Sequence, residues 1–573
     1  MTLAWCKADA LEPLMRRSPG YIARLGAVLL AGVVGSVCSA APVSQFRVTL
    51  TPHGSTTPVT GRLIIAVAQK GSPEPRTTIG IYGPAIFGRD VSGLRPGESA
   101  VVDTQSNGFP VPLSRLVPGT YFVQALLVRY DQVHRADGHT LWVPIHPLRD
   151  TPFTEAQGNL FSDVQTVALD PRQGFSVSVE LRHAIPPSAP PKDTAWIKHI
   201  RIKSKLLSEF WGVPMYLGAA VLLPRGFASH PHARYPALYA MSQGDPPYLF
   251  SLEPSTAAER EALAARSNLK TGYEFYQSWI SQRYPRMAVV SVYDASPYFA
   301  EAYAVDSANA GPVGKAITTE LIPYLERKFR LIREPYARVL EGASTGGWET
   351  LALQLKYPTF FGGAWVFNPD PISFQHWQLI DIYHDDKMFT VQRTPQLSVE
   401  LPFSRTTEGV PTFTQRQLAA LEAVLGSHGR SNYQLDIWQD AYGPVGSDGY
   451  PVLLFDKQTG EIHHEVANYM RDHGYDLTEY ARTHWGTLGP ELRGKLYFIS
   501  GEMDNFYLNL GVYDFQHMLL KTAGPDYPVS FTYGRPEKGH GWHKVDFAEM
   551  IREMAAHIEN SAPTGADVSQ WNY

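Results

Sequence analysis

The chain has 573 residues, of which 44% are hydrophobic and 18% are charged, so it exceeds the size of one ordinary domain. This composition excludes a disordered chain and a membrane bundle, and it predicts two or three globular domains. The net charge of -5 comes without a long run of one sign, so nucleic acid is not expected as a partner.

Residues 1–40 have the pattern of a secretory signal peptide. Arg16 and Arg17 lie ahead of an apolar stretch over 25–40, which ends in small residues. Such a pattern is typical of cleavage during export, here before Ala41. The apolar stretch is shorter than the roughly 20 residues of a spanning helix, so no stable membrane anchor is expected. We therefore expect a periplasmic or secreted protein.

Both cysteines of the chain, Cys6 and Cys38, lie within this leader. After cleavage the protein would have no disulfide, no thiolate metal site and no cysteine nucleophile. Its stability would then depend on the burial of its core alone.

Residues 42–185 alternate between apolar and polar side chains in short runs, as in the FSVSVEL segment at 175–181. Turn signals such as Arg95-Pro96-Gly97 separate these runs, and long helical periodicity is absent. The pattern predicts an all-β domain, most simply a β-sandwich. A proline-rich stretch over 186–195 then predicts a stiff linker.

From residue 196 to 560 apolar strands alternate with helices, and a tail follows over 561–573. This order implies a mostly parallel sheet with helices on both faces. The expected strands are 218–223, 237–241, 287–293, 337–341, 363–367, 495–500 and 529–532. The expected helices are 314–330, 345–356, 514–522 and 545–558.

An irregular insertion at about 370–490 interrupts the alternation of strands and helices. It has two expected helices of its own, over 414–425 and 461–473. The first begins with a capping box formed by Thr414 and Gln417. The insertion is interpreted either as a cap that selects substrate and excludes water, or as a surface elaboration.

Ser344 lies where an apolar strand meets a helix, in the sequence VLEGASTGGWE. Gly342 and Gly346 permit a crowded turn that exposes the serine hydroxyl, and Gly347 lets helix and strand approach closely. The helix N-terminus and the Thr345 N–H would stabilise an oxyanion beside the serine. A glycine-rich turn without catalysis is the alternative, but the strand before it and the helix after it favour a nucleophile.

A serine nucleophile needs an acid and a histidine base, which follow it in that order in this architecture. His540 lies in the glycine-flanked loop KGHGWH after the last expected strand and is the predicted base, with His543 as the runner-up. Asp504, which follows the strand at 495–500, is the predicted acid, with Glu502 as the fallback.

The second oxyanion donor is expected in the loop after the strand at 237–241. This loop reads SQGD, so the backbone N–H of Gln243 or Gly244 could serve. The reaction so assembled implies no metal and no organic cofactor.

These residues resemble the putative esterase family of α/β hydrolases, which includes esterase D, enterochelin esterases, feruloyl esterases and mycolyltransferases. The resemblance is clearest over 315–367, in the helix ELIPYLE and in the GASTGG elbow around Ser344. The segments GEMD, ending at Asp504, and GHGW, around His540, resemble the family's acid and histidine loops more weakly. An α/β-hydrolase fold after the β-sandwich is thereby implied.

The chain departs from the family pattern at two places. In the loop that corresponds to the one after 237–241, the family commonly has His-Gly, where this chain has Gln243-Gly244. The insertion also lengthens the interval between Ser344 and Asp504.

The sequence therefore predicts an exported serine esterase in which Ser344 forms an acyl-enzyme, His540 is the base and Asp504 orients it. The expected substrate is a small-molecule, glycan or aromatic ester. Acyl transfer to a hydroxyl acceptor, a serine peptidase of the prolyl-oligopeptidase type, and a non-catalytic binding protein on a hydrolase fold stay open as alternatives. The acyl and alcohol parts of the substrate, the role of the β-domain and the oligomeric state also stay open.

Overall fold

The structure is a computed structural model that describes residues 42–571 with the exception of 145–151, 243, 265–267 and 300. The predicted leader and Gln243 lie outside the described residues. Across the described ranges, no helix combines the length and the apolar character needed to cross a membrane.

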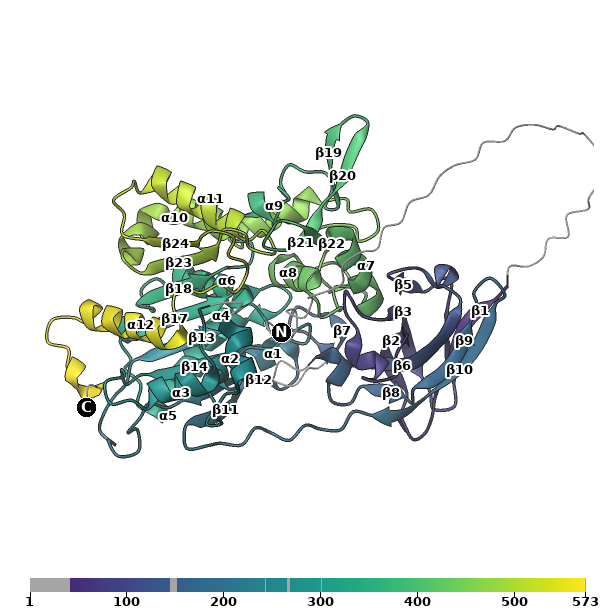
Figure 1. Cartoon of the computed structure of the whole chain (residues 1–573), viewed down its shortest axis with the longest axis horizontal. Coiled ribbons are helices and arrows are strands. Elements are labelled where there is room, and N and C mark those ends of the chain that lie inside the picture. Colours follow the sequence, from purple (N-terminus) through teal and green to yellow (C-terminus); the bar gives the residue numbers. More distant parts are fainter. Residues whose placement is uncertain (1–41, 145–151, 243, 265–267, 300, 572–573) are drawn as a thin grey trace, which may run out of the picture.

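The N-terminal region is all β, as its alternating pattern predicts (Figure 1). Its strands are β1 (Ser44–Leu50), β2 (Val59–Ala68), β3 (Ala85–Leu94), β4 (Ser99–Asp103), β5 (Asn107–Phe109), β6 (Gly119–His134), β7 (Thr140–Val143), β8 (Leu160–Ser162), β9 (Gln165–Leu169) and β10 (Phe175–Ala184). The buried positions Val179 and Leu181 of β10 alternate with more exposed neighbours, so one face of the strand enters the core.

The strands of this region form one continuous sheet in the order β4-β1-β10-β8-β6-β2-β3-β5, and β7 and β9 also pair with β6. A sandwich of two separate sheets was expected. The sheet is continuous because β8 pairs with both β10 and β6, and so connects the half β4-β1-β10 to the half β6-β2-β3-β5. The two halves share a core, in which Phe46 and Val48 of β1 belong to the same apolar cluster as Leu63 and Ile65 of β2.

The second sheet has eight strands in the order β11-β12-β14-β13-β17-β18-β23-β24. Their bounds are β11 (Ile197–Ser204), β12 (Met215–Leu222), β13 (Ala237–Met241), β14 (Ala288–Tyr293), β17 (Arg338–Ala343), β18 (Gly363–Phe367), β23 (Leu496–Gly501) and β24 (Ser530–Gly534). The pairings from β14 to β24 are parallel, whereas β11–β12 and β12–β14 are antiparallel. A mostly parallel sheet is thus present, with the unpredicted β11 at one edge.

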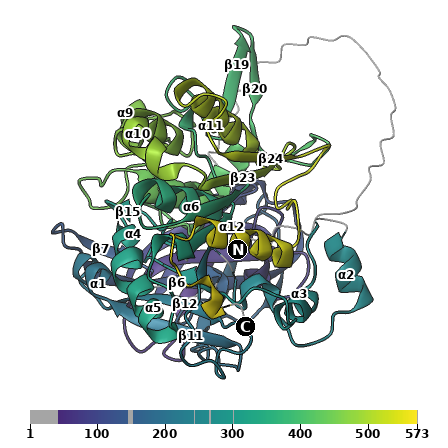
Figure 2. The ribbon, with the colours of Figure 1, turned by 90° about the vertical axis from the view of Figure 1, so that its left-hand side faces the viewer.

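Helices cover both faces of this sheet, with α3 and α12 on one side and α4, α5 and α6 on the other (Figure 2). The helices of this part are α1 (Lys205–Trp211), α2 (Ala257–Ala264), α3 (Gly272–Trp279), α4 (Val313–Ala316), α5 (Ile322–Phe329), α6 (Thr345–Lys356), α11 (Asn509–Thr522) and α12 (Phe547–Ser561). The helix expected over 314–330 contains a π-helical turn, Ile317–Leu321. Within it, the Thr318 and Thr319 hydroxyls donate to the carbonyls of Gly314 and Lys315.

The insertion lies above the sheet and next to the N-terminal β region (Figure 1). Its elements are β19 (Thr390–Thr394), β20 (Leu397–Glu400), β21 (Pro402–Arg405), β22 (Pro411–Thr414), α7 (Gln415–Leu425), α8 (Gln434–Tyr442), α9 (His464–Asp472) and α10 (Leu477–Leu492). The predicted capping box of α7 is present, with Thr414 and Gln417 each bonding the other's backbone N–H. Helices α8 and α10 were not predicted.

The N-terminal sheet caps the carboxyl end of α7. Arg62 of β2 donates from Nε to the Val424 carbonyl at 2.8 Å and from Nη2 to the Ala423 carbonyl at 2.7 Å. Asn107 of β5 donates to the same Ala423 carbonyl at 2.7 Å. Because the last carbonyls of a helix have no partner within it, these donors fix the insertion against the β region.

Candidate active site

Ser344 lies in a strained turn between β17 and α6. Its φ of 59° and ψ of -120° are unusual for a residue other than glycine. The side chain is partly exposed. Such a turn at the carboxyl end of a central parallel strand presents the hydroxyl at the edge of the sheet.

The glycines around Ser344 are needed because the backbone is crowded there. A Cβ on Gly342 would lie 2.3 Å from the Gly346 carbonyl oxygen, and one on Gly346 would lie 2.3 Å from that of Met241. A Cβ on Gly347 would approach the Phe367 carbonyl oxygen to 2.7 Å. The close approaches predicted for these positions are therefore present, and they bring the start of α6 against the loop after β13.

Asp504 and His540 lie together beyond the carboxyl ends of β23 and β24. His540 Nδ1 is 2.7 Å from Asp504 Oδ2. The other carboxylate oxygen, Oδ1, accepts the backbone N–H groups of Phe506 at 2.8 Å and Leu508 at 3.3 Å. The loop N–H of His540 donates to Asn505 Oδ1 at 2.8 Å. These contacts fix both loops and assign the Nδ1 proton to the side that faces Asp504.

The environment of His540 favours its charged form. Burial alone would lower the pKa of His540, but the charge and hydrogen bond of Asp504, and then the charge of Asp370, raise this pKa above its ordinary value. Phe506 packs edge-on against the imidazole, with ring centroids 5.0 Å apart. The ring is thus held with Nε2 as the nitrogen left to accept a proton.

The Ser344 hydroxyl donates to Asp370 Oδ1 at 3.2 Å. Within the described part of the chain it makes no hydrogen bond to His540. The geometry therefore brings His540 and Asp504 together, and it places a second, unpredicted carboxylate directly on the serine.

The two runner-up residues face other partners. His543 stacks on Phe367 with ring centroids 4.7 Å apart, and its Nδ1 donates to the Gly541 carbonyl at 2.9 Å. Burial lowers the pKa of His543 to about 4. Glu502 forms an ion pair with Arg535 at 3.0 Å. Neither residue joins the Asp504–His540 pair.

Of the predicted oxyanion donors, the structure describes Thr345 and Gly244. Thr345 occupies the first turn of α6, where the backbone N–H has no carbonyl partner within the helix. Gly244 accepts a hydrogen bond from Ser291 through its carbonyl at 3.0 Å. Ser242, which precedes it, has a φ of 53° and donates to Glu301 at 2.5 Å. Gln243 itself lies outside the described residues.

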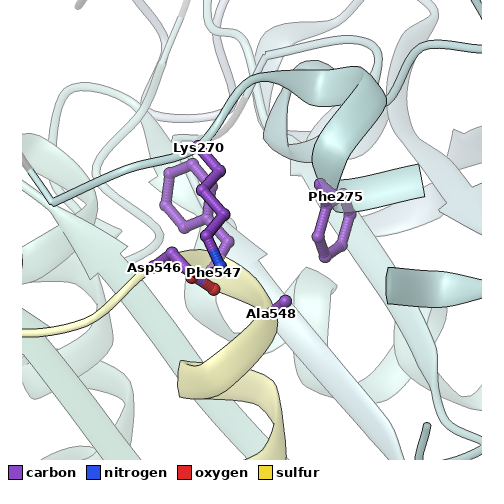
Figure 3. Close-up of a pocket in the computed structure, with 5 residues that line it drawn as sticks. All are labelled: Lys270, Phe275, Asp546, Phe547 and Ala548. Carbon is purple, nitrogen blue, oxygen red and sulfur yellow. Dashed lines mark ion pairs between the residues drawn. The ribbon is translucent and has the colours of Figure 1, made fainter. Parts of the chain in front are cut away.

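The loop that carries His540 is fastened to the segment before α3. Asn268 donates to the carbonyls of His543 at 3.0 Å and Lys544 at 3.1 Å. Figure 3 shows the adjoining pocket, where Lys270 lies over Asp546 and forms an ion pair with it at 2.6 Å. The Lys270–Asp546 ion pair in this pocket holds the end of the histidine loop in place. None of the predicted site residues lines the pocket.

Part of the chain is similar to a known protein family. Residues 215–407 match the model of the family described as putative esterase. The matched segment covers about a third of the chain and is similar to that family. The match includes Ser344 and Asp370, and it ends before Asp504 and His540. The resemblance predicted from the sequence is confirmed in this segment.

Solved structures with some likeness to the chain include three esterases or hydrolases. A ferulic acid esterase has 14% identity and a TM-score of 0.35, and the match covers 64% of this chain and 98% of that one. A fluorophosphonate-binding serine hydrolase of Staphylococcus aureus has 13% identity and a TM-score of 0.30, with 63% and 98% covered. An S-formylglutathione hydrolase from Agrobacterium tumefaciens has 13% identity and a TM-score of 0.31, with 64% and 97% covered. No curated protein matches the chain.

Sequence reasoning missed the group of side chains around Asp370. The signal that could have found Asp370 is its position, three residues after the end of β18. Polar side chains just beyond the carboxyl ends of parallel strands often belong to the site of such a sheet. Across the described ranges, no three His, Cys, Asp or Glu side chains gather in the manner of a metal site.

Proposed function

We propose that the protein is an exported serine hydrolase that cleaves carboxylic esters on an α/β-hydrolase fold. Ser344 is the nucleophile, His540 the general base and Asp504 the residue that orients the base. The observation that carries this proposal is the 2.7 Å contact of His540 Nδ1 with Asp504, which leaves Nε2 free of that contact and able to accept a proton. The same sheet presents Ser344 on a strained turn.

The reaction proceeds through an acyl-enzyme. Ser344 Oγ attacks the acyl carbon while its proton passes to His540 Nε2, and Asp504 stabilises the imidazolium. The N–H groups of Thr345 and of the Gln243–Gly244 loop donate to the oxyanion. His540 then returns the proton to the leaving alcohol, and water hydrolyses the acyl-enzyme with His540 again as the base.

The resting orientation of the serine adds one step to this reaction. Because the Ser344 hydroxyl donates to Asp370, it must turn toward His540 before its proton can transfer. Rotation of a serine side chain is fast compared with typical turnover, so this step is compatible with catalysis.

The sequence supports a proposal for the location of the enzyme and for the class of substrate to test. A leader over residues 1–40 supports export to the periplasm or the medium. A small-molecule, glycan or aromatic ester is the substrate class to test, with a panel of esters of graded acyl length and aromaticity.

Ser344→Ala tests the proposal most simply. We expect ester turnover to fall by roughly 10⁴ to 10⁶, with an unchanged circular dichroism spectrum and melting temperature. Ser373→Ala is the matched control, since Ser373 follows Asp370 by three residues and donates to Asp514 at 2.7 Å. Retained hydrolysis in the Ser344 variant would show that another residue is the nucleophile.

A further inference from the structure

Asp370 is built into the backbone of the nucleophile turn. Its N–H donates to the Ser344 carbonyl at 3.0 Å, and the Ser344 N–H donates to the Phe367 carbonyl at 3.0 Å. The residue is only 2% exposed. The carboxylate is therefore held at a fixed position relative to the serine.

Both oxygens of the Asp370 carboxylate accept hydrogen bonds from neighbouring hydroxyl groups. Oδ1 accepts from the Ser344 hydroxyl at 3.2 Å. Oδ2 accepts from Thr345 Oγ1 at 3.1 Å and from the Tyr303 hydroxyl at 2.5 Å. Each of these hydroxyls donates to the carboxylate in this arrangement, and such hydrogen bonds favour its ionised form.

Helix α8 of the insertion supplies two further donors to the same oxygen. Gln434 Nε2 lies 3.3 Å and Trp438 Nε1 lies 3.1 Å from Asp370 Oδ2. Both groups also donate to the Tyr303 hydroxyl, at 2.9 and 2.8 Å. Helix α8 is thus connected to the Ser344 hydroxyl through the Asp370 carboxylate.

The charged neighbours of this group set its electrostatic effect. Burial raises the pKa of Asp370 above its ordinary value, against the donors just described and the charge of His540. The Asp370 charge in turn raises the pKa values of Tyr303, Glu349 and Tyr442, which burial raises most.

His540 has neighbours of both signs. Asp504 and Asp370 raise its pKa, as described above. His543 lies on the same loop and is itself affected by the charge of His540. Arg405 of β21 approaches from the insertion, where its Nε donates to the Asp504 carbonyl at 3.0 Å.

We propose that Asp370 is a positioning residue that holds the Ser344 hydroxyl in the resting enzyme and serves as a second anionic neighbour of His540. Helix α8 then contributes to the catalytic centre through its hydrogen bonds to Asp370, and the role of the insertion goes beyond covering the site. This inference rests on the proposed function, because it needs Ser344 as the nucleophile and His540 as its base. The carboxylate holds the hydroxyl in the resting orientation, from which it turns toward His540, and it stabilises the imidazolium that forms when the proton transfers.

Asp370→Asn tests the inference in the full-length protein, since it keeps the shape and removes the charge. The measurement is the second-order rate of labelling by a fluorophosphonate probe as a function of pH. In the wild type this rate rises with pH as His540 loses its proton. In the variant we expect the rise to move to lower pH by about half a unit or more, because a nearby anion no longer stabilises the imidazolium. We also expect the plateau rate to fall roughly tenfold, because the Asp370 charge no longer stabilises the imidazolium that forms as the proton transfers.

Asp476→Asn is the matched control. Asp476 is an equally buried aspartate of the insertion that accepts from Tyr383 at 2.9 Å and from the Phe374 N–H at 3.0 Å. We expect this variant to lose stability and to keep the wild-type pH profile of labelling. A profile of Asp370→Asn that superimposes on the wild type, or an equal shift in both variants, would overturn the inference.

Trp438→Phe keeps the inference testable if Asp370→Asn does not fold. It removes one donor to Asp370 and keeps an aromatic ring at the site. A plateau labelling rate a few-fold below the wild type supports the role of α8, and an unchanged plateau contradicts it. If the wild type itself is not labelled at Ser344, the proposed function and this inference both fail. If the wild type is labelled and the variants match it, only the inference fails.

Discussion

The two sides of the Ser344 site are held by different kinds of interaction. On the histidine side, Asp504 is fixed by backbone N–H groups two and four residues away in its own loop. On the insertion side, Asp370 is fixed by the side chains of Tyr303, Gln434 and Trp438, which come from distant parts of the chain. The first side depends on local loop geometry, and the second depends on the docking of a whole insertion.

This difference indicates where the site tolerates change. A loop whose donors are its own backbone keeps its shape when neighbouring side chains vary. A carboxylate held by long-range side-chain contacts loses its position when any of the packed elements moves. Substitutions on the histidine side should therefore act directly on the chemistry, and those on the insertion side should act through position and stability.

The largest effect is expected from Asp504→Asn on the histidine side. Loss of the carboxylate releases the preferred imidazole tautomer and the stabilised imidazolium, so turnover should fall by roughly 10⁴. Steady-state hydrolysis of an aryl ester measures this. Glu502→Gln is the control two residues away, and it should stay within about twofold because Glu502 pairs with Arg535 at the surface. Equal losses in both variants would contradict the assignment of the acid.

A smaller effect is expected from Arg62→Met, which weakens the contact between the insertion and the N-terminal sheet. The variant loses the two hydrogen bonds to the carbonyls at the end of α7. The free energy of unfolding should fall by about 1–3 kcal/mol, and labelling of Ser344 should slow a few-fold while the pH at which it rises stays the same.

The control for this variant is Arg89→Met. Arg89 is an exposed residue of β3 that donates to the Val101 carbonyl within the same sheet. Its loss should leave labelling unchanged. A wild-type labelling rate in Arg62→Met would show that the docking of the insertion does not reach the serine.

The smallest effect is expected at Glu341, in the strand that leads to Ser344, and it concerns stability alone. Glu341 of β17 is fully buried, and it accepts from the Tyr248 hydroxyl at 2.6 Å. Burial raises the pKa of Glu341 to about 7, although the Tyr248 hydrogen bond opposes this. The folded protein therefore holds the proton more tightly than the unfolded chain, whose glutamate has an ordinary pKa near 4.3. Its stabilising contribution is complete below that value and is lost as the pH rises through about 7.

Glu341→Gln should remove this dependence on pH. The melting temperature of the variant, relative to the wild type, should increase between pH 4.5 and pH 8, and thermal unfolding at both values measures it. A difference in melting temperature that is the same at both values would contradict the burial account.

The sequence predicted the features of the site that are encoded locally. The GASTGG turn, the strand ahead of it and α6 after it follow from glycine spacing and apolar periodicity, and the bounds of α6 agree with the prediction. The pairing of Asp504 with His540 could be predicted because each residue follows an apolar strand in a fixed chain order.

The rest depends on contacts between distant segments. Tyr303, Gln434 and Trp438 belong to no motif, and their convergence on Asp370 follows only from the packing of the insertion. The continuity of the N-terminal sheet has a similar origin, because it depends on the three-residue strand β8, which is too short to give a period-two signal. The edge strand β11 was missed because its isoleucines do not alternate regularly with polar residues, since Ile197 and Ile200 are three positions apart.

The most direct test of the central claim is to identify the residue that a fluorophosphonate labels in the wild type, by digestion and mass spectrometry. The account predicts one adduct on the peptide that contains Ser344, and its loss in His540→Ala with the fold intact. An adduct on another serine, or undiminished labelling of Ser344 without His540, would contradict it.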